Sequence, residues 1–284
     1  MKVRKLRYAG KCGCGERLPA GSRAGWNSAT RQVICERCLW PVPTVTPQAV
    51  APEPLLPVQI DIGRPGASLT RQYHQRVAQR DARVRRDHPR LGGLILALTD
   101  QPQTTHAFAS GAVGEQKAAE RIVKACGPDA LFLHNRRLGL GRQDGDVDMI
   151  AITSRGIHVI DVKRYVDKTV EVRRSGGFFS PVKEQLVVGG RDKTKLLQSL
   201  DRQVEAVRAA LSSCAAGDAL QIVPSLCFVD ADLPIIRNRN LKIRGVLVLG
   251  LRDTTKLLAR STGSLTVEQR QLIHAHLARR MPAA

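Results

Sequence analysis

The chain has 284 residues, enough for one large domain or two modest ones, and 45 Lys and Arg against 25 Asp and Glu give it a formal net charge of +20. A positive excess of this size favours polyanionic partners, nucleic acid before anionic lipid. No apolar run approaches the roughly 18–20 residues that cross a bilayer, and the basic N-terminal segment lacks the apolar stretch of a signal peptide. We therefore expect a cytoplasmic protein, with nucleoid association as one possible site, and no membrane partner.

The first 40 residues contain four of the seven cysteines, in two close pairs: Cys12 with Cys14, and Cys35 with Cys38. An odd total without a secretion signal argues against a disulfide framework. Two close pairs predict a zinc-ribbon-like module in residues 1–40, with tetrahedral thiolate coordination of a structural Zn²⁺. The first pair is one residue closer than the usual C-x₂-C, and a redox C-x-x-C is the rival interpretation, although no βαβ pattern surrounds it. Because so small a module has little core, it should need the metal to fold.

A linker and a basic helix follow. Residues 41–67 hold seven of the fifteen prolines, which predicts an extended, semi-rigid linker. Residues 68–88 contain no Gly or Pro and predict a helix with Ser68 or Thr70 as its cap and Pro89 as its stop, within a basic-helix-and-connector segment at 68–107. Residues 71–90 carry seven arginines against two aspartates. The helix is either a strip that tracks phosphates or an ordinary solvated face; in the first case the contacts would be Arg76, Arg80, Arg83 and Arg86.

The remaining residues, 108–284, show strands enclosed by helices, which predicts an α/β or α+β domain with a mixed sheet in three layers. In chain order we expect a helix over about 111–125, strands near 130–136, 147–153, 156–165 and 169–173, a helix over 193–212, strands near 222–229 and 244–250, and a helix from Thr266 to about 280. The last helix opens with Thr266-Val-Glu-Gln269, which resembles a capping box.

The segment 145–165 is the most informative in the chain. A tight turn at Ser154-Arg155 pairs Thr153 with Gly156, and counting back along both strands brings Asp148 opposite Asp161. Lys163 is on the same face, two residues further on. Two opposed carboxylates among Ile and Val predict a site for a divalent cation, whereas an odd-length loop would place them on opposite faces.

Glu115 supports this prediction from the preceding helix. It heads a stripe that continues through Ala119, Ile122 and Cys126, at the spacing of one helical face. Three of the four positions are apolar, so Glu115 should face the core, where an unpaired carboxylate is costly. We therefore expect it to have a partner.

These motifs together carry a resemblance. Gly114-Glu115 on a leading helix, Gly145-Asp-Val-Asp148 entering a strand and Val159-Ile-Asp-Val-Lys-Arg-Tyr165 resemble the NERD (nuclease-related) domain, a branch of the PD-(D/E)xK nuclease superfamily, over roughly residues 108–215. The resemblance implies a restriction-endonuclease-like core: a mixed sheet flanked by helices. The cysteine-rich N-terminus also resembles actinobacterial members of this family.

The resemblance also implies a set of catalytic residues. They are Glu115 as the helix carboxylate, Asp148 as the first strand carboxylate, Asp161 and Lys163 as the D-x-K pair, and Gln203 on the following helix, with Gln198 as the alternative. The chain departs from the pattern where Asp161 replaces the commoner Glu, and where Arg164-Tyr-Val-Asp167 replaces Asn-Tyr-x-Gly.

The chemistry explains why these residue types are needed. A phosphodiester repels nucleophiles, so a divalent cation must neutralise it and activate water. The oxygens of Glu115, Asp148 and Asp161 would select Mg²⁺ or Mn²⁺, and Lys163 would orient or deprotonate water or stabilise developing charge. We expect a metal-dependent deoxyribonuclease that binds DNA without strong sequence specificity. The alternatives are a non-catalytic nucleic-acid-binding module that retains the fold and a protein-interaction adaptor.

Overall fold

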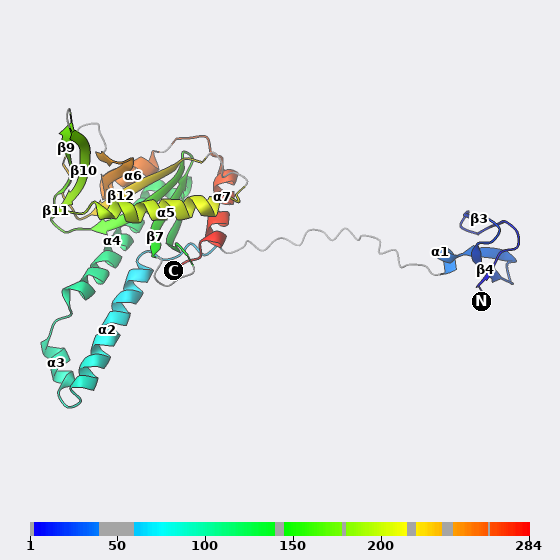
Figure 1. The fold of residues 1–284 in the computed structure, drawn as a ribbon, viewed down its shortest axis with the longest axis horizontal. Coiled ribbons are helices and arrows are strands. Elements are labelled where there is room, and N and C mark those ends of the chain that lie inside the picture. The colour runs from blue at the N-terminus through cyan, green and yellow to red at the C-terminus, as the bar shows by residue number, and fades with distance from the viewer. Residues whose placement is uncertain are drawn as a thin grey trace. The chain divides into compact units, whose positions relative to one another are not determined.

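The computed structural model describes residues 3–39, 60–139, 145–177, 180–214, 220–234, 241–260 and 262–284 (Figure 1). The chain divides into two compact units, Met1–Val58 and Gln59–Ala284. The proline-rich linker expected at 41–67 lies mostly outside the described residues, which resume at Ile60. Each unit is described by itself below.

The N-terminal unit is built from short strands. β1 (Val3–Lys5), β4 (Arg23–Asn27) and β5 (Gln32–Cys35) form an antiparallel sheet, β2 (Gly10–Lys11) pairs with β3 (Arg17–Leu18), and α1 (Glu36–Leu39) ends the unit. Its buried cluster contains two cysteines, Cys12 and Cys35, beside Leu18 and Ala24. So small an apolar core provides little hydrophobic stabilisation.

The C-terminal unit centres on a six-stranded sheet with the order β13-β14-β12-β8-β7-β6. The strands are β6 (Leu131–Arg137), β7 (Asp146–Thr153), β8 (Gly156–Arg164), β12 (Ile222–Val229), β13 (Leu241–Ile243) and β14 (Val246–Gly250). β12 runs parallel to β8 and β14, and the other pairings are antiparallel. The predicted mixed sheet flanked by helices is therefore confirmed.

Helices cover both faces of this sheet (Figure 1). On one face, α5 (Lys195–Leu211) and α7 (Val267–Arg280) pack on the side chains of Ile150, Ile152 and Val159. On the other, α4 (Gln103–Cys126) and α6 (Leu251–Ala259) pack on Met149 and Ile160. Alternate residues of β7 and β8 thus enter different cores, as the two-residue period of a strand requires. A 3₁₀ turn, η1 (Gly127–Asp129), joins α4 to β6.

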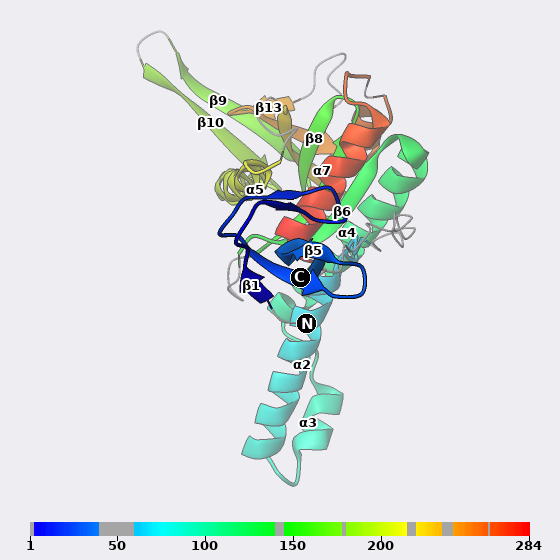
Figure 2. The same ribbon diagram turned by 90° about the vertical axis from the view of Figure 1, so that its right-hand side faces the viewer.

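Two projections extend from this three-layer body in different directions (Figure 2). One is helical: α2 (Ala67–Asp87) packs against α4, and α3 (Gly92–Leu98) packs against α2. The other is a ribbon of β9 (Val170–Gly177), β10 (Ser180–Val188) and β11 (Arg191–Asp192) in the order β11-β10-β9.

The structure corrects several details of the predicted elements. The N-cap of α2 is Gly66, at φ 73°, and neither Ser68 nor Thr70 caps the helix, since the Ser68 hydroxyl donates to Asn135 instead. The strand expected near 169–173 is the first of a three-stranded sheet, and neither β13 nor α6 was predicted. The capping box of α7 is confirmed, because the Thr266 N–H donates to Gln269 Oε1 and the Gln269 N–H donates to Thr266 Oγ1.

Candidate active site

The β7–β8 hairpin has the predicted register. Thr153 pairs with Gly156 across a two-residue turn, and the ladder continues to the pair Met149–Ile160, so that Asp148 and Asp161 occupy the next position on each strand. Here the Val162 N–H donates to Asp148 Oδ2 at 2.8 Å. Lys163 Nζ lies 2.9 Å from Asp161 Oδ2 and 3.8 Å from Asp148 Oδ2. The even-length turn therefore brings both aspartates to one lysine.

Glu115 reaches the same place from α4. Its side chain is buried, and its Oε2 accepts hydrogen bonds from the Gly66 N–H at 2.9 Å and from Asn135 Nδ2 at 3.1 Å. These two donors are the partners that a buried carboxylate needs. One comes from the segment before α2 and the other from β6, and neither was predicted.

Gln203, not Gln198, is the glutamine that reaches the carboxylates. The buried Gln203 on α5 donates from Nε2 to Asp161 Oδ1 at 2.9 Å. Gln198 is exposed near the start of the same helix and lines a separate cavity. Asp161 is thus held between an amide on one oxygen and an ammonium on the other.

Burial and crowding shift the acidity of these groups. Burial raises the pKa of Asp148 well above its ordinary value, and the neighbouring charge of Glu115 raises it further. Burial also raises the pKa of Glu115, although the hydrogen bond from Gly66 opposes the shift. Burial alone would lower the pKa of Lys163, but the carboxylates of Asp161 and Asp148 outweigh it and raise that pKa.

This donor set suits a hard divalent cation. Asp148 and Asp161 pair with a single ammonium, and Glu115 is close enough for its charge to act on Asp148 and Lys163. Burial raises the pKa of both Glu115 and Asp148. Oxygen ligands of this kind fit Mg²⁺ or Mn²⁺ rather than a thiophilic metal. The residues that would hold the ion are Glu115, Asp148 and Asp161.

The structure adds a short polar chain behind Glu115. Ser68 Oγ donates to Asn135 Oδ1 at 2.7 Å, and Asn135 Nδ2 donates to the Arg64 carbonyl at 2.8 Å as well as to Glu115. Asn135 has a φ of 46° and falls between the pairs His134–Met149 and Arg136–Val147, at the level of Asp148. The polar residues 134–137, which follow the apolar start of β6, were the feature of the sequence that could have indicated Asn135.

The four N-terminal cysteines also come together. Their sulfur atoms all lie within 4.8 Å of one another, and Cys14 Sγ is 3.7 Å from Cys35 Sγ. Tetrahedral Zn²⁺ with Zn–S bonds of about 2.3 Å separates its sulfurs by about 3.8 Å. Hydrogen bonds from the backbone of Cys14 and Cys35 lower the pKa of Cys12 to about 6, whereas side-chain hydrogen bonds with Glu16 and Cys14 raise the pKa of Cys35 and Cys38, respectively. The cluster fits a zinc ion.

The arginines predicted to contact nucleic acid differ in their surroundings. Arg76 stacks its guanidinium 4.5 Å from the ring centre of Phe108, and Arg80 donates to Thr99 Oγ1 at 2.6 Å, so both tie α2 to its neighbours within the helical projection. Arg83 is exposed, and the exposed Arg86 lies 3.3 Å from the carboxylate of Asp87. Arg76 is exposed as well and Arg80 is half-buried, so Arg83 and Arg86 differ from them in having no hydrogen bond or ring contact outside α2 among the described residues.

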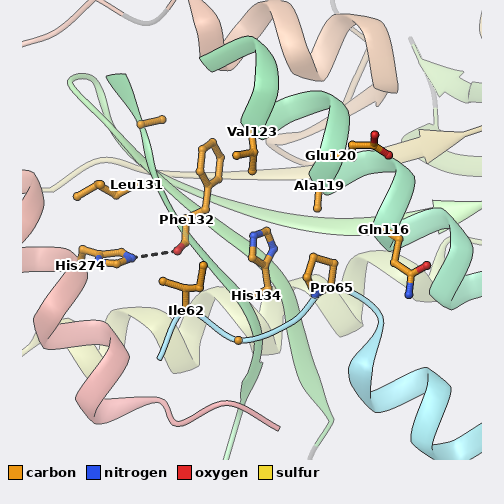
Figure 3. A pocket seen from close by; sticks show the side chains of 12 residues that line it. Ile62, Pro65, Gln116, Ala119, Glu120, Val123, Leu131, Phe132, His134 and His274 are labelled. Atoms are coloured by element: carbon orange, nitrogen blue, oxygen red, sulfur yellow. Dashed lines mark hydrogen bonds between the residues drawn. The ribbon is translucent and has the colours of Figure 1, made fainter. Parts of the chain in front are cut away.

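An apolar groove of about 630 Å³ lies between α4, β6, α7 and residues 62–65 (Figure 3). His134 is buried in it and stacks on Phe132, and His274 Nε2 bonds the Phe132 carbonyl oxygen at 2.9 Å. Burial lowers the pKa of His134 to about 4. Burial therefore favours the neutral form of His134, and the groove lacks the clustered carboxylates of the site beside Lys163.

One comparison with known proteins bears on the part of the chain that holds this site. Residues 110–229 match the family model of the nuclease-related domain, NERD. The match runs from within α4 to the end of β12, so it includes Glu115, Asp148, Asp161, Lys163 and Gln203 but begins after Gly66 and Ser68. No curated protein and no solved structure matches the chain. None of the helices in the described ranges is both long enough and apolar enough to cross a membrane.

Proposed function

We propose that the nuclease-related domain hydrolyses phosphodiester bonds in DNA, with Mg²⁺ or Mn²⁺ held by Glu115, Asp148 and Asp161. The observation that carries the proposal is the pairing of Asp148 on β7 and Asp161 on β8 with Lys163. Glu115 on α4 is near enough for its charge to act on this pair, and Gln203 bonds Asp161. The net charge of +20 supports a polyanionic substrate.

A divalent cation bound there would neutralise phosphodiester charge and lower the pKa of a coordinated water. Lys163, paired with two carboxylates at 2.9 and 3.8 Å, is held as an ammonium and acts as a hydrogen-bond donor. It would orient the attacking water or stabilise the developing negative charge on the phosphate oxygens. Gln203 fixes the carboxylate plane of Asp161, leaving Asp161 Oδ2 directed at Lys163.

The rest of the chain would bring substrate to this site. We propose the organisation expected above: a four-cysteine structural zinc module at 1–40, a linker at 41–67, a basic helix and connector at 68–107, and the nuclease-like domain at 108–284. The solvent-facing Arg83 and Arg86 would contribute electrostatic attraction to phosphates, without reading sequence.

The test is incubation of plasmid and linear DNA with the full chain in Mg²⁺, Mn²⁺ or EDTA. We expect cleavage only with metal, and a loss on the order of 100-fold or more in Asp161→Asn and Lys163→Ala, as for removal of a group that stabilises a transition state. The matched control is Asp253→Asn, an exposed aspartate on α6, which should cleave normally. Cleavage that persists in EDTA would overturn the metal-dependent mechanism, and binding of DNA without cleavage would favour the non-catalytic alternative.

A further inference from the structure

A second cavity opens beside the start of α5. It has a volume of about 610 Å³ and is lined by Tyr165, Lys193, Lys195, Gln198 and Arg244 among others. Its walls come from the segment after β8, from the entry to α5 and from the turn between β13 and β14. Three separate parts of the chain thus contribute a cation or a polar side chain to one hollow.

The side chains that line the cavity carry more positive than negative charge. Lys193, Lys195 and Arg244 form no ion pair with any residue in the described ranges. The one carboxylate in the lining, Asp192, already accepts from the Thr194 N–H at 2.8 Å and from Gln185 Nε2 at 3.2 Å.

A carboxylate that contacts the backbone of Arg244 is occupied as well. Glu184 pairs with Arg174 at 2.8 Å and accepts the backbone N–H of Arg244 at 3.1 Å. Three cations against one carboxylate leave the lining with a net positive charge, which favours an anionic ligand. Lysine and arginine donors suit the oxygens of a phosphate in particular.

The cavity is next to the candidate active site. Tyr165, in its wall, follows Lys163 by two residues and packs its ring 6.0 Å from that of Phe228. The helix that starts at the cavity also carries Gln203, which bonds Asp161. Lys195 precedes Gln203 by eight residues, about 12 Å along an α-helix. Since a nucleic-acid strand advances about 3.4 Å per nucleotide along a duplex, this is about three or four nucleotides.

We propose that this cavity is a subsite for a backbone phosphate of the substrate strand, about three or four nucleotides from the bond that is cleaved. Lys193, Lys195 and Arg244 supply the charge, and Gln198 and Tyr165 supply further polar contacts. The inference rests on the proposed function, because it takes the strand to be the substrate of the carboxylate site. It gives that site a second anchor, which fixes the path of the strand across α5.

The test measures binding apart from cleavage. A fluorescently labelled DNA duplex is titrated with the full chain in EDTA, at several salt concentrations, using wild type and the double variant Lys195→Gln/Arg244→Gln. Both side chains are exposed, so the substitutions should leave thermal unfolding unchanged. The matched control is Arg121→Gln/Lys124→Gln, which removes the same charges from exposed positions on α4, on the other face of the sheet.

We expect the double variant to bind at least tenfold more weakly at low salt. Its slope of log affinity against log salt should fall by about 0.9 for one lost phosphate contact, while the control stays close to wild type. Equal losses in both variants would show general attraction only and would overturn the subsite. Inorganic phosphate or a nucleoside monophosphate that displaces the duplex at micromolar concentration would also overturn it, in favour of a free-anion site.

The experiments distinguish a failure of the phosphate subsite from a failure of the proposed nuclease function. If wild type does not cleave DNA with any metal but the double variant still loses affinity and salt slope, the phosphate subsite stands and the nuclease assignment falls. If wild type cleaves and the double variant binds like wild type, the assignment stands and the subsite falls.

Discussion

Asn135 is the residue whose replacement tests the architecture of the site most directly. Its amide donates to Glu115 Oε2 at 3.1 Å and to the Arg64 carbonyl at 2.8 Å, and its oxygen accepts from Ser68 at 2.7 Å. Asn135→Gly removes all three bonds without introducing charge. Glycine also tolerates the φ of 46° at this position, so the backbone is not strained.

Two effects can be worked out from this geometry. Each of the three hydrogen bonds contributes about 1 kcal/mol net, so the variant should lose about 3 kcal/mol of stability. Glu115 keeps only the Gly66 N–H as a donor and is less firmly oriented. Partners that orient a metal ligand in this way are worth about 10- to 100-fold in metal affinity. We expect Mn²⁺ binding to weaken by that factor.

Isothermal titration with Mn²⁺, with urea unfolding alongside, separates the two effects. Ile152→Val on β7, fully buried in the core, should lower stability by about 1 kcal/mol and leave Mn²⁺ affinity unchanged. Ser68→Ala removes only the bond to Asn135 and should weaken Mn²⁺ binding less than Asn135→Gly does. An Asn135→Gly variant that binds Mn²⁺ as tightly as wild type would refute a positioning role for Asn135.

Three further outcomes follow from the structure. Chelation of zinc should unfold the Met1–Val58 unit and leave the Gln59–Ala284 unit folded. Amide exchange measures this, and exchange in β4 and β5 that stays slow after chelation would contradict the zinc assignment. Gly114→Ala places a Cβ 2.8 Å from Arg164 Cβ and should cost about 1–3 kcal/mol by overpacking; an unchanged urea midpoint would show that Arg164 shifts freely. Burial lowers the pKa of His158 from 6.5 to about 4. As the pH falls, the imidazole is therefore protonated in the unfolded chain before it is protonated in the folded chain. About 3 kcal/mol of stability should be lost between pH 6.5 and pH 4. His158→Gln should flatten that loss in urea unfolding measured across the pH range, and a parallel curve would rule out His158 as its source.

The sequence by itself determined the parts of the site that depend on local geometry. The register of β7 and β8 follows from a two-residue turn and a period of two, which is why Asp148, Asp161 and Lys163 could be placed on one face. The helical period of 3.6 was sufficient to turn Glu115 inward. Cysteine spacing likewise indicated the four-thiolate cluster, since each close pair brings two sulfurs together by itself.

Only the tertiary structure decided what surrounds those groups. Glu115 is held by Gly66, 49 residues away, and Ser68 reaches Asn135 across 67 residues, distances at which no periodicity carries information. For the same reason Ser68, a suitable helix cap by its local sequence, donates its hydroxyl to Asn135 instead, and Arg80 donates to Thr99 of the following segment. Local patterns specify which face a side chain takes on its own element. The polar partner that each buried side chain finds depends on how elements distant in sequence pack together. A polar group loses its contact with water only in the folded core, and only there does leaving it unpaired cost free energy.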